Sequence, residues 1–160
     1  MPEKVNLKFF NMGKVVENNI SIHAPIETVW DMLTNPEQTK KYMFGCEAVS
    51  DWKPGSTLLW RASYEGKDMV FVKGHIVAIQ PPTLLTYTVI DPNADMPDIP
   101  DNYLNVTYEL SEQDGTTLLT VSQDGFEKAA DGEKRYQDVY NNGQGWNPIL
   151  VEIKKLAEAG

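Results

Sequence analysis

The side chains that most often ligate metals or carry out catalysis are few in this sequence. The chain contains 2 His and 1 Cys, and His23, His75 and Cys46 lack the close spacing of a metal site. His75 lies in a predicted strand and would transfer protons only if that strand directed it toward a partner such as Tyr87. The other partner considered, Glu109, is directed outward by strand alternation. We therefore predict no catalytic residue, no metal site and no cofactor.

The acidic segment DPNADMPDIPDN has the beginning of a calcium-binding loop. Asp91, Asn93 and Asp95 are spaced like the first ligands of an EF-hand. Met96 stands where that loop needs a glycine for its sharp turn, and Asn102 stands where it needs a bidentate glutamate. Strands rather than helices are predicted on both sides. The segment is therefore interpreted as a solvated loop stiffened by its prolines.

Aromatic and aliphatic residues at alternate strand positions form the strongest candidate site. Residues two apart in a strand point to the same face of a sheet, so the rows that contain Trp60, Tyr87 and Tyr108 are predicted to share the concave face. A wall of this kind is typical of an apolar small-molecule site of about 300 to 1,000 Å³. The alternative, a solid core of interdigitated side chains, stays open. The predicted ligand-binding residues are Trp60, Tyr87, Tyr108 and Gln123 of the strands and Trp146, Leu150 and Ile153 of the last helix.

The hydrophobic pattern predicts the elements that position these residues. Residues 15–23 alternate as a strand, and residues 24–35 and 36–43 form two short helices, each with a proline near its start. Turn signals separate further β-type runs, which predict an antiparallel meander. The layout is α+β, with a curved antiparallel sheet that wraps around a long C-terminal helix. The runs of the meander are residues 56–64, 69–80, 84–90, 102–110 and 116–123.

The last segment, residues 132–159, is predicted to be one long bent helix. Its apolar residues recur at spacings of three and four throughout. Gly143, Gly145 and Pro148 cost helix stability on the order of several kcal/mol, which packing against the sheet would have to offset. Two interpretations stay open. The bend follows the shape of the core, or it loosens the helix beside Trp146 to admit a ligand.

Five segments carry a resemblance to a known family, in this order: ISIHAPIETVWDMLTNPEQTKKYM, VSDWKPGSTLLWR, KGHIVAIQPPTLLTYT, VTYELSEQDGTTLLTVSQDGF and GWNPILVEIKKL. From Val16 to Glu158 the chain resembles homologues of the activator of the heat-shock-protein-90 ATPase, within the START-like, birch-pollen-allergen-like (SRPBCC) superfamily. The resemblance implies a helix-grip fold in a single START-like domain, residues 1–160. It also implies an internal cavity between sheet and closing helix, used in different members for small apolar ligands or for chaperone contact.

Length, charge and cysteine content limit the partners. A chain of 160 residues is long enough for one domain with a sizeable core. Its net charge of -9 would repel nucleic-acid phosphates and anionic membranes, so neither is a predicted partner. The single cysteine, the lack of a long apolar run and the N-terminal MPEKVNLKFFNMGKVV, which has no export pattern, predict a cytoplasmic protein. The sequence does not predict the oligomeric state.

Three functions are compatible with these observations. The preferred one is non-enzymatic binding or carriage of a small hydrophobic or aromatic molecule, lipids included, in the internal cavity. The first alternative, which the superfamily implies, is a polyketide cyclase-like or dehydratase-like enzyme in which His75 or a pocket tyrosine transfers protons. The second is a chaperone ATPase co-factor or another protein-interaction module that acts through an acidic surface. The identity of the ligand stays open.

Overall fold

Seven strands form one antiparallel sheet in the residues that the structure, a computed structural model, describes, 14–159. They lie in the order β1-β7-β6-β5-β4-β3-β2, so the first strand pairs with the last. This confirms the predicted meander and adds β2, whose four residues are too few to show a clear alternation. The strands are β1 Val16–Ile22, β2 Glu47–Ser50, β3 Thr57–Tyr64, β4 Lys67–Gln80, β5 Leu84–Val89, β6 Leu104–Gln113 and β7 Thr116–Asp124.

The hairpin of β6 and β7 shows how the sequence specifies this sheet. Asp114 and Gly115 form its two-residue turn, and both have positive φ, 52° and 79°. That backbone conformation matches the twist of paired antiparallel strands. Along β6, buried residues alternate with more exposed ones, which directs one row of side chains into the core: Leu104, Val106, Tyr108 and Leu110.

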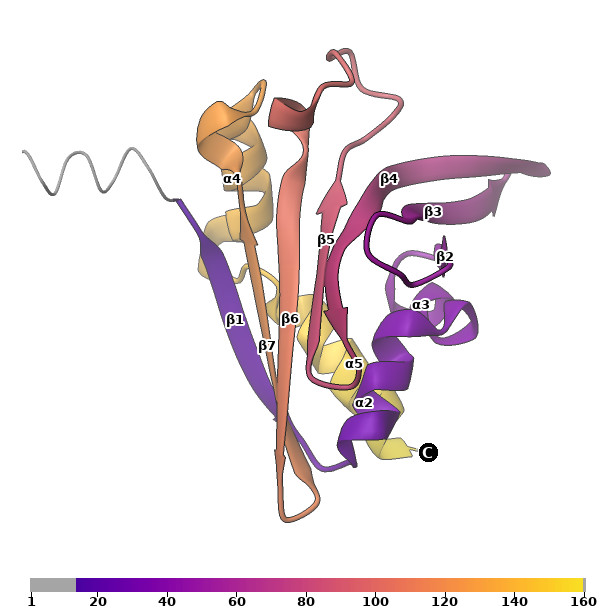
Figure 1. Cartoon of the computed structure of the whole chain (residues 1–160), viewed down its shortest axis with the longest axis vertical. Coiled ribbons are helices and arrows are strands. Elements are labelled where there is room, and N and C mark those ends of the chain that lie inside the picture. Colours follow the sequence, from indigo (N-terminus) through magenta and orange to yellow (C-terminus); the bar gives the residue numbers. More distant parts are fainter. Residues whose placement is uncertain (1–13, 160) are drawn as a thin grey trace, which may run out of the picture.

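The sheet is curved, and Figure 1 shows β4 bending along its length. The register of strand pairing shifts at Trp60 in β3 and again between Ile76 and Ala78 in β4. Such bulges bend a strand and increase its twist. Gly74 permits the close approach of β4 to β5, because a Cβ there would lie 1.6 Å from the carbonyl oxygen of Thr88.

Four helices flank the sheet in the described part of the chain. They are α2 Ile26–Thr34, α3 Pro36–Tyr42, α4 Gly132–Tyr140 and α5 Asn147–Ala159. Short 3₁₀ turns occur at Pro100–Asn102, Phe126–Lys128 and Asn141–Gly143. Figure 1 shows α5 crossing one face of the sheet, with α2 beside it. Leu150, Ile153 and Ala157 of α5 are buried in the common core. The arrangement confirms the α+β helix-grip class.

The closing segment is two helices, so the prediction of one bent helix over residues 132–159 is wrong. Apolar spacing reports which side chains share a face, whereas it carries no information on backbone handedness. A left-handed linker separates α4 from α5 and ends the first helix. Pro148 lies in the first turn of α5, where its missing amide removes no helical hydrogen bond. The linker residues with positive φ are Asn141, Asn142, Gly143 and Gly145.

Part of one expectation lies outside the described residues. The N-terminal stretch that was expected to lack an export signal falls mainly in residues 1–13. Within the described residues, the buried hydrophobic side chains other than Ile90 form one core cluster. Among the helices described, none combines the length and the apolar character needed to cross a bilayer.

Candidate functional site

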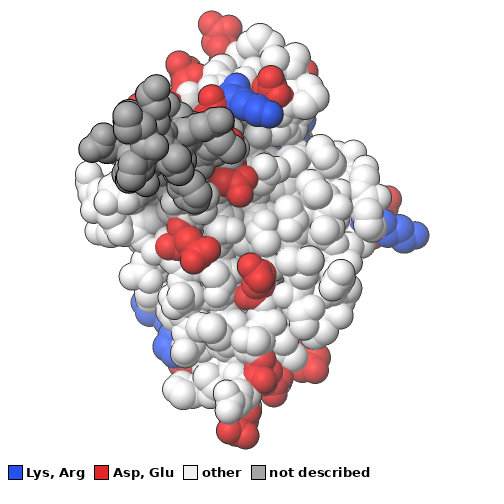
Figure 2. Space-filling model, turned by 60° about the vertical axis from the view of Figure 1, so that its left-hand side comes forward, with Lys and Arg blue, Asp and Glu red and all other residues white. Residues whose placement is uncertain are grey.

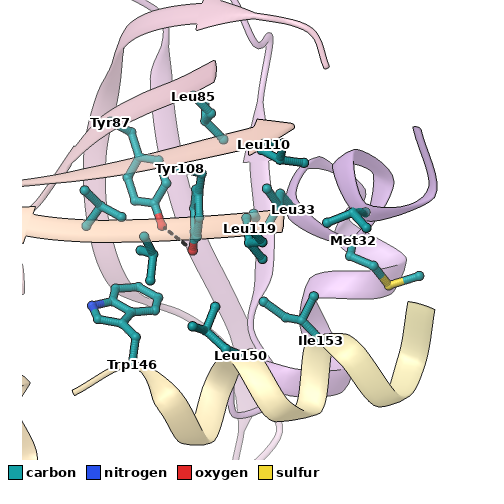
Figure 3. Close-up of a cluster of buried hydrophobic side chains, with 14 of the residues drawn as sticks. Met32, Leu33, Leu85, Tyr87, Tyr108, Leu110, Leu119, Trp146, Leu150 and Ile153 are labelled. Carbon is teal, nitrogen blue, oxygen red and sulfur yellow. Dashed lines mark hydrogen bonds between the residues drawn. The ribbon is translucent and has the colours of Figure 1, made fainter. Parts of the chain in front are cut away.

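A row of four aromatic rings crosses the inner face of the sheet and ends at α5. Successive ring centroids are 6.0, 5.9 and 6.0 Å apart, and the rings meet in tilted or edge-on orientations, which are favourable for aromatic pairs. Figure 3 shows the hydrogen bond within the row, which joins the two tyrosine hydroxyl oxygens over 3.3 Å. In order, the rings belong to Trp60 of β3, Tyr87 of β5, Tyr108 of β6 and Trp146.

Burial keeps both tyrosine hydroxyls neutral. Removal from water raises the pKa of Tyr108 to about 12. It also raises the pKa of Tyr87 well above its ordinary value. The physical cause is that a phenolate loses its hydration inside the protein. Both residues are therefore phenols at neutral pH, able to hydrogen-bond but poorly suited to act as a general base.

Trp146 is held in place by polar contacts with β1 and β7. Its indole nitrogen donates to Gln123 Oε1 at 3.0 Å, and its backbone nitrogen donates to Asn18 Oδ1 at 2.9 Å. Asn18 Nδ2 in turn donates to the carbonyl oxygen of Gln144 at 3.3 Å. Gly145 is required here, because a Cβ would lie 2.3 Å from Asn18 Oδ1. The linker before α5 is thereby fixed against the sheet.

A pocket of about 440 Å³ lies beside the aromatic row, where the sheet meets the turn between α3 and β2 and the residue that precedes α5. No charged side chain lines it. The lining is mainly aromatic and aliphatic, with few polar groups. Its size and composition match those of small-molecule sites in proteins.

The comparison with known families agrees with this architecture. Residues 23–158 match the family model described as "Activator of Hsp90 ATPase homolog 1-like protein". The chain belongs to this family. No curated protein matches the chain. The family resemblance inferred from the sequence motifs is thus confirmed.

Solved structures share the fold of this family member. The solution structure of ChR145 from Cytophaga hutchinsonii is 35% identical, with 91% of this chain and 94% of that chain covered, and has a TM-score of 0.69. CalU16 from Micromonospora echinospora is 20% identical over 90% of this chain and 74% of that chain, with a TM-score of 0.63. The Aha1 dimer from Colwellia psychrerythraea is 15% identical over 92% and 98%, with a TM-score of 0.64.

The structure divides the predicted ligand-binding residues into two groups. Trp60, Tyr87, Gln123 and Trp146 line the pocket. The remaining residues, Tyr108, Leu150 and Ile153, are fully buried core residues that do not line it. Figure 3 shows Leu150 and Ile153 pointing from α5 into the layer of side chains beneath the sheet. The space between the sheet and α5 is therefore filled by side chains along the helix, and the pocket lies near the N-terminal end of α5.

Sequence reasoning missed two neighbouring pocket residues in β4. Phe71 and Val72 both line the pocket, although strict alternation would send adjacent residues to opposite faces. The bulge explains this, because Trp60 pairs with Val72 and Arg61 pairs with Val70, which leaves Phe71 without a partner. The sequence carries no readable signal of this irregularity.

The turn between α3 and β2 supplies further lining residues that the sequence analysis missed. They are Met43, Phe44 and Cys46. Phe44 is 88% exposed and has a positive φ of 56°. It also borders an adjoining hollow of about 290 Å³, which shares Gln123 and Trp146 with the pocket. The dipeptide of Phe44 and Gly45 was the signal available, since glycine marks turns, but it does not show where the turn lies in space.

The pocket contrasts with the outer surface of this family member. Figure 2 shows acidic side chains spread over one face of the molecule, with fewer basic ones. This agrees with 23 acidic against 14 basic residues in the whole chain. The field around the protein therefore disfavours the approach of anions, while the uncharged pocket offers them no counter-ion.

His75 lies on the face of the sheet opposite to the pocket. Its Nδ1 is 3.1 Å from Thr88 Oγ1, and its side chain is exposed. It borders a polar surface hollow together with Asp98 and Tyr103. Because adjacent strand residues point to opposite faces, the side chain of Thr88 faces away from Tyr87. The proton-transfer arrangement of His75 with Tyr87 is therefore not formed.

The acidic loop is held by hydrogen bonds within and beside it and by an ion pair to β4. The backbone nitrogen of Asn93 donates to Asp91 Oδ1 at 2.8 Å, which is an Asx turn. Asp98 forms an ion pair with Lys73 and accepts a hydrogen bond from the Tyr103 hydroxyl at 2.5 Å. Within residues 14–159, no group of three or more His, Cys, Asp or Glu side chains is placed to hold a metal ion.

Proposed function

We propose that this protein binds a small apolar molecule in the 440 Å³ pocket, as a carrier or sensor rather than through chemistry on the ligand. The observation that supports the proposal is the composition of the wall. Aromatic rings from three strands, Trp60, Phe71 and Tyr87, line a space without any charged group. Apolar surface that enters such a space leaves water, which is the main source of affinity for ligands of this class.

The size of the pocket sets the scale of the affinity. A ligand of two or three fused rings would bury on the order of 250 Å² of apolar surface, worth about 6 kcal/mol at roughly 25 cal/mol per Å². The loss of translational and rotational freedom offsets a large part of this gain. Because 6 kcal/mol without any offset corresponds to a dissociation constant of only about 40 μM, we expect dissociation constants from about 100 μM to the millimolar range.

Two tryptophans of the wall report on binding directly. Titration with a panel of lipids, flavonoids and polyketide-like aromatics is expected to change the fluorescence of Trp60 and Trp146 and to raise the melting temperature. A free ligand concentration of about 100 times the dissociation constant stabilises the folded state by roughly 2.7 kcal/mol. Trp60→Phe and Trp146→Phe should each remove part of the fluorescence response, whereas Trp30→Phe, outside the pocket, should leave it intact. A panel without any response in either measurement would refute the proposal.

Chaperone contact is the second candidate, favoured by the family description, which names activators of the Hsp90 ATPase. Its test is the ATPase rate of a purified Hsp90 with and without this protein. An unchanged rate together with no complex in analytical ultracentrifugation would dispose of it. The cytoplasmic location predicted from the sequence is consistent with either candidate.

An enzymatic alternative would need a proton-transferring group inside the pocket. His75 faces the other side of the sheet, and the pKa of Tyr87 is raised well above its ordinary value. Product analysis after incubation with polyketide substrates, for the wild type and Tyr87→Phe, tests this activity. Turnover that depends on the Tyr87 hydroxyl would replace the binding proposal with an enzymatic one.

A further inference from the structure

The pocket wall contains a hydrogen-bond donor that has no acceptor. Trp60 is 5% exposed and lines the pocket. Its Nε1 is the buried side-chain nitrogen or oxygen that lacks a hydrogen-bond partner among residues 14–159. Buried polar groups in native proteins are nearly always paired, and an unpaired one lowers stability. The described chain therefore provides no acceptor for this N–H, and because the nitrogen has almost no exposed surface, an acceptor on a ligand reaches it only when the indole shifts slightly.

Gln123 supplies a second donor at the same wall. Its Oε1 accepts the indole N–H of Trp146 at 3.0 Å, which fixes the orientation of the amide, because only the oxygen can accept. The amide nitrogen, with two N–H groups, then makes no hydrogen bond to any described side chain or backbone atom. Gln123 lines both the pocket and the adjoining hollow.

The other polar groups of the wall carry no charge. The Tyr87 hydroxyl is already hydrogen-bonded to Tyr108. Cys46 is a thiol, which is a weak hydrogen-bonding group. Neither lysine nor arginine lines the pocket, and the one charged residue that borders the adjoining hollow is Asp138. The pocket thus presents donors in an uncharged, apolar space.

We propose that the ligand is an uncharged apolar compound that carries carbonyl or ether oxygens, which accept hydrogen bonds from Trp60 Nε1 and the Gln123 amide. The proposal rests on the proposed function and specifies its ligand class. A carboxylate would satisfy the donors but would enter a pocket without a cation in a protein of net charge -9. A hydrocarbon, or an amine in its protonated form, would leave both donors unpaired.

The test uses four probes built on one naphthalene ring, so that shape and apolar area stay nearly constant. They are the methyl ketone, the ethyl hydrocarbon, the carboxylate and the primary amine, and their affinities are measured by calorimetry. The free energy of transfer from water to octanol is subtracted from each probe's binding free energy to correct for its hydrophobicity. After this correction, the ketone should have the most favourable binding free energy. Trp60→Phe should lower the ratio of ketone to hydrocarbon affinity by about three- to tenfold, the effect of one hydrogen bond. Trp30→Phe makes the same chemical change outside the pocket and should keep that ratio.

A measurement on the wild-type protein covers the case in which Trp60→Phe does not fold. The indole N–H resonance of Trp60 should shift downfield with the ketone and much less with the hydrocarbon, as expected for a new hydrogen bond. Equal shifts, an unchanged affinity ratio in Trp60→Phe, or a carboxylate that binds as well as the ketone would each overturn the ligand class while leaving apolar binding in place. Failure of all four probes, the hydrocarbon included, would overturn the proposed function and the ligand class with it.

Discussion

Replacement of Gly145 by alanine is expected to release the linker that holds Trp146 at the pocket. Gly145 has a φ of 53°, and a left-handed backbone costs a residue with a Cβ roughly 1–2 kcal/mol. The new Cβ would lie 2.3 Å from Asn18 Oδ1, so Asn18 must move and its hydrogen bond to the backbone nitrogen of Trp146 is lost, at about 1 kcal/mol. Alanine also lowers the conformational entropy of the unfolded chain, which stabilises the folded state by about 0.4–1 kcal/mol. The net loss of stability should be about 2 kcal/mol.

Gly143→Ala is the matched control for this prediction. Gly143 also has a positive φ, 92°, but a Cβ there would meet only the Tyr140 hydroxyl at 3.8 Å, an ordinary contact. Its loss should be about 1 kcal/mol, from strain alone. Urea unfolding followed by fluorescence distinguishes the two variants. The free energy of unfolding falls by about 2 kcal/mol per M of urea, so the unfolding midpoint of the Gly145 variant should be about 1 M lower than that of the wild type.

Three results would decide whether Asn18 carries the effect. In an Asn18→Ala background, Gly145→Ala should cost no more than the Gly143 variant does, because the same contact cannot be lost twice. The Gly145 variant should also bind apolar probes more weakly, since Trp146 lines the pocket. Equal destabilisation by the two glycine substitutions in the wild-type background would refute the reasoning.

Further predictions concern the buried polar groups. Tyr87→Phe should cost about 1 kcal/mol in urea unfolding by stranding the Tyr108 hydroxyl, and adding Tyr108→Phe should cost little more; a fully additive double variant would contradict this. Because the pKa of Tyr108 is raised to about 12 when folded, from about 10 when unfolded, the protein should be stable up to pH 10 and lose stability as the pH rises toward 12, with the phenolate absorbance of Tyr108 appearing only on unfolding. The chain has 7 tyrosines, so the Tyr108 signal is the difference in absorbance between the wild type and Tyr108→Phe, and a difference near pH 10 in the native state would show that the ring is solvated. Burial raises the pKa of the Cys46 thiol, so its alkylation at neutral pH should be slower than that of a free thiol, and slower again with ligand bound; ligand-independent alkylation would place the ligand elsewhere.

Most of the secondary structure could be predicted because it depends on local patterns. The alternation in β6 and β7, the glycine turn between them and the proline at the start of α3 each act within a few residues. The break between α4 and α5 could not be predicted from apolar spacing, because Tyr136 and Ile153 keep helical spacing across a linker that is not helical. The glycines were visible there, but the left-handed conformation of Asn141 and Asn142 was not.

The sequence by itself determined the strands other than β2, the inward rows and the family, since these follow from the periodicity and order of residues along the chain. Only the tertiary structure decided which inward side chains are solid core and which border a hollow. Tyr87 and Tyr108 are equivalent by alternation, yet the first lines the pocket and the second does not. The pocket is also lined by the bulged segment of β4 opposite Trp60 and by the α3–β2 turn, and alternation along a strand predicts neither. An unfilled volume is a property of surfaces that meet from distant parts of the chain, and short-range periodicity carries no information about it.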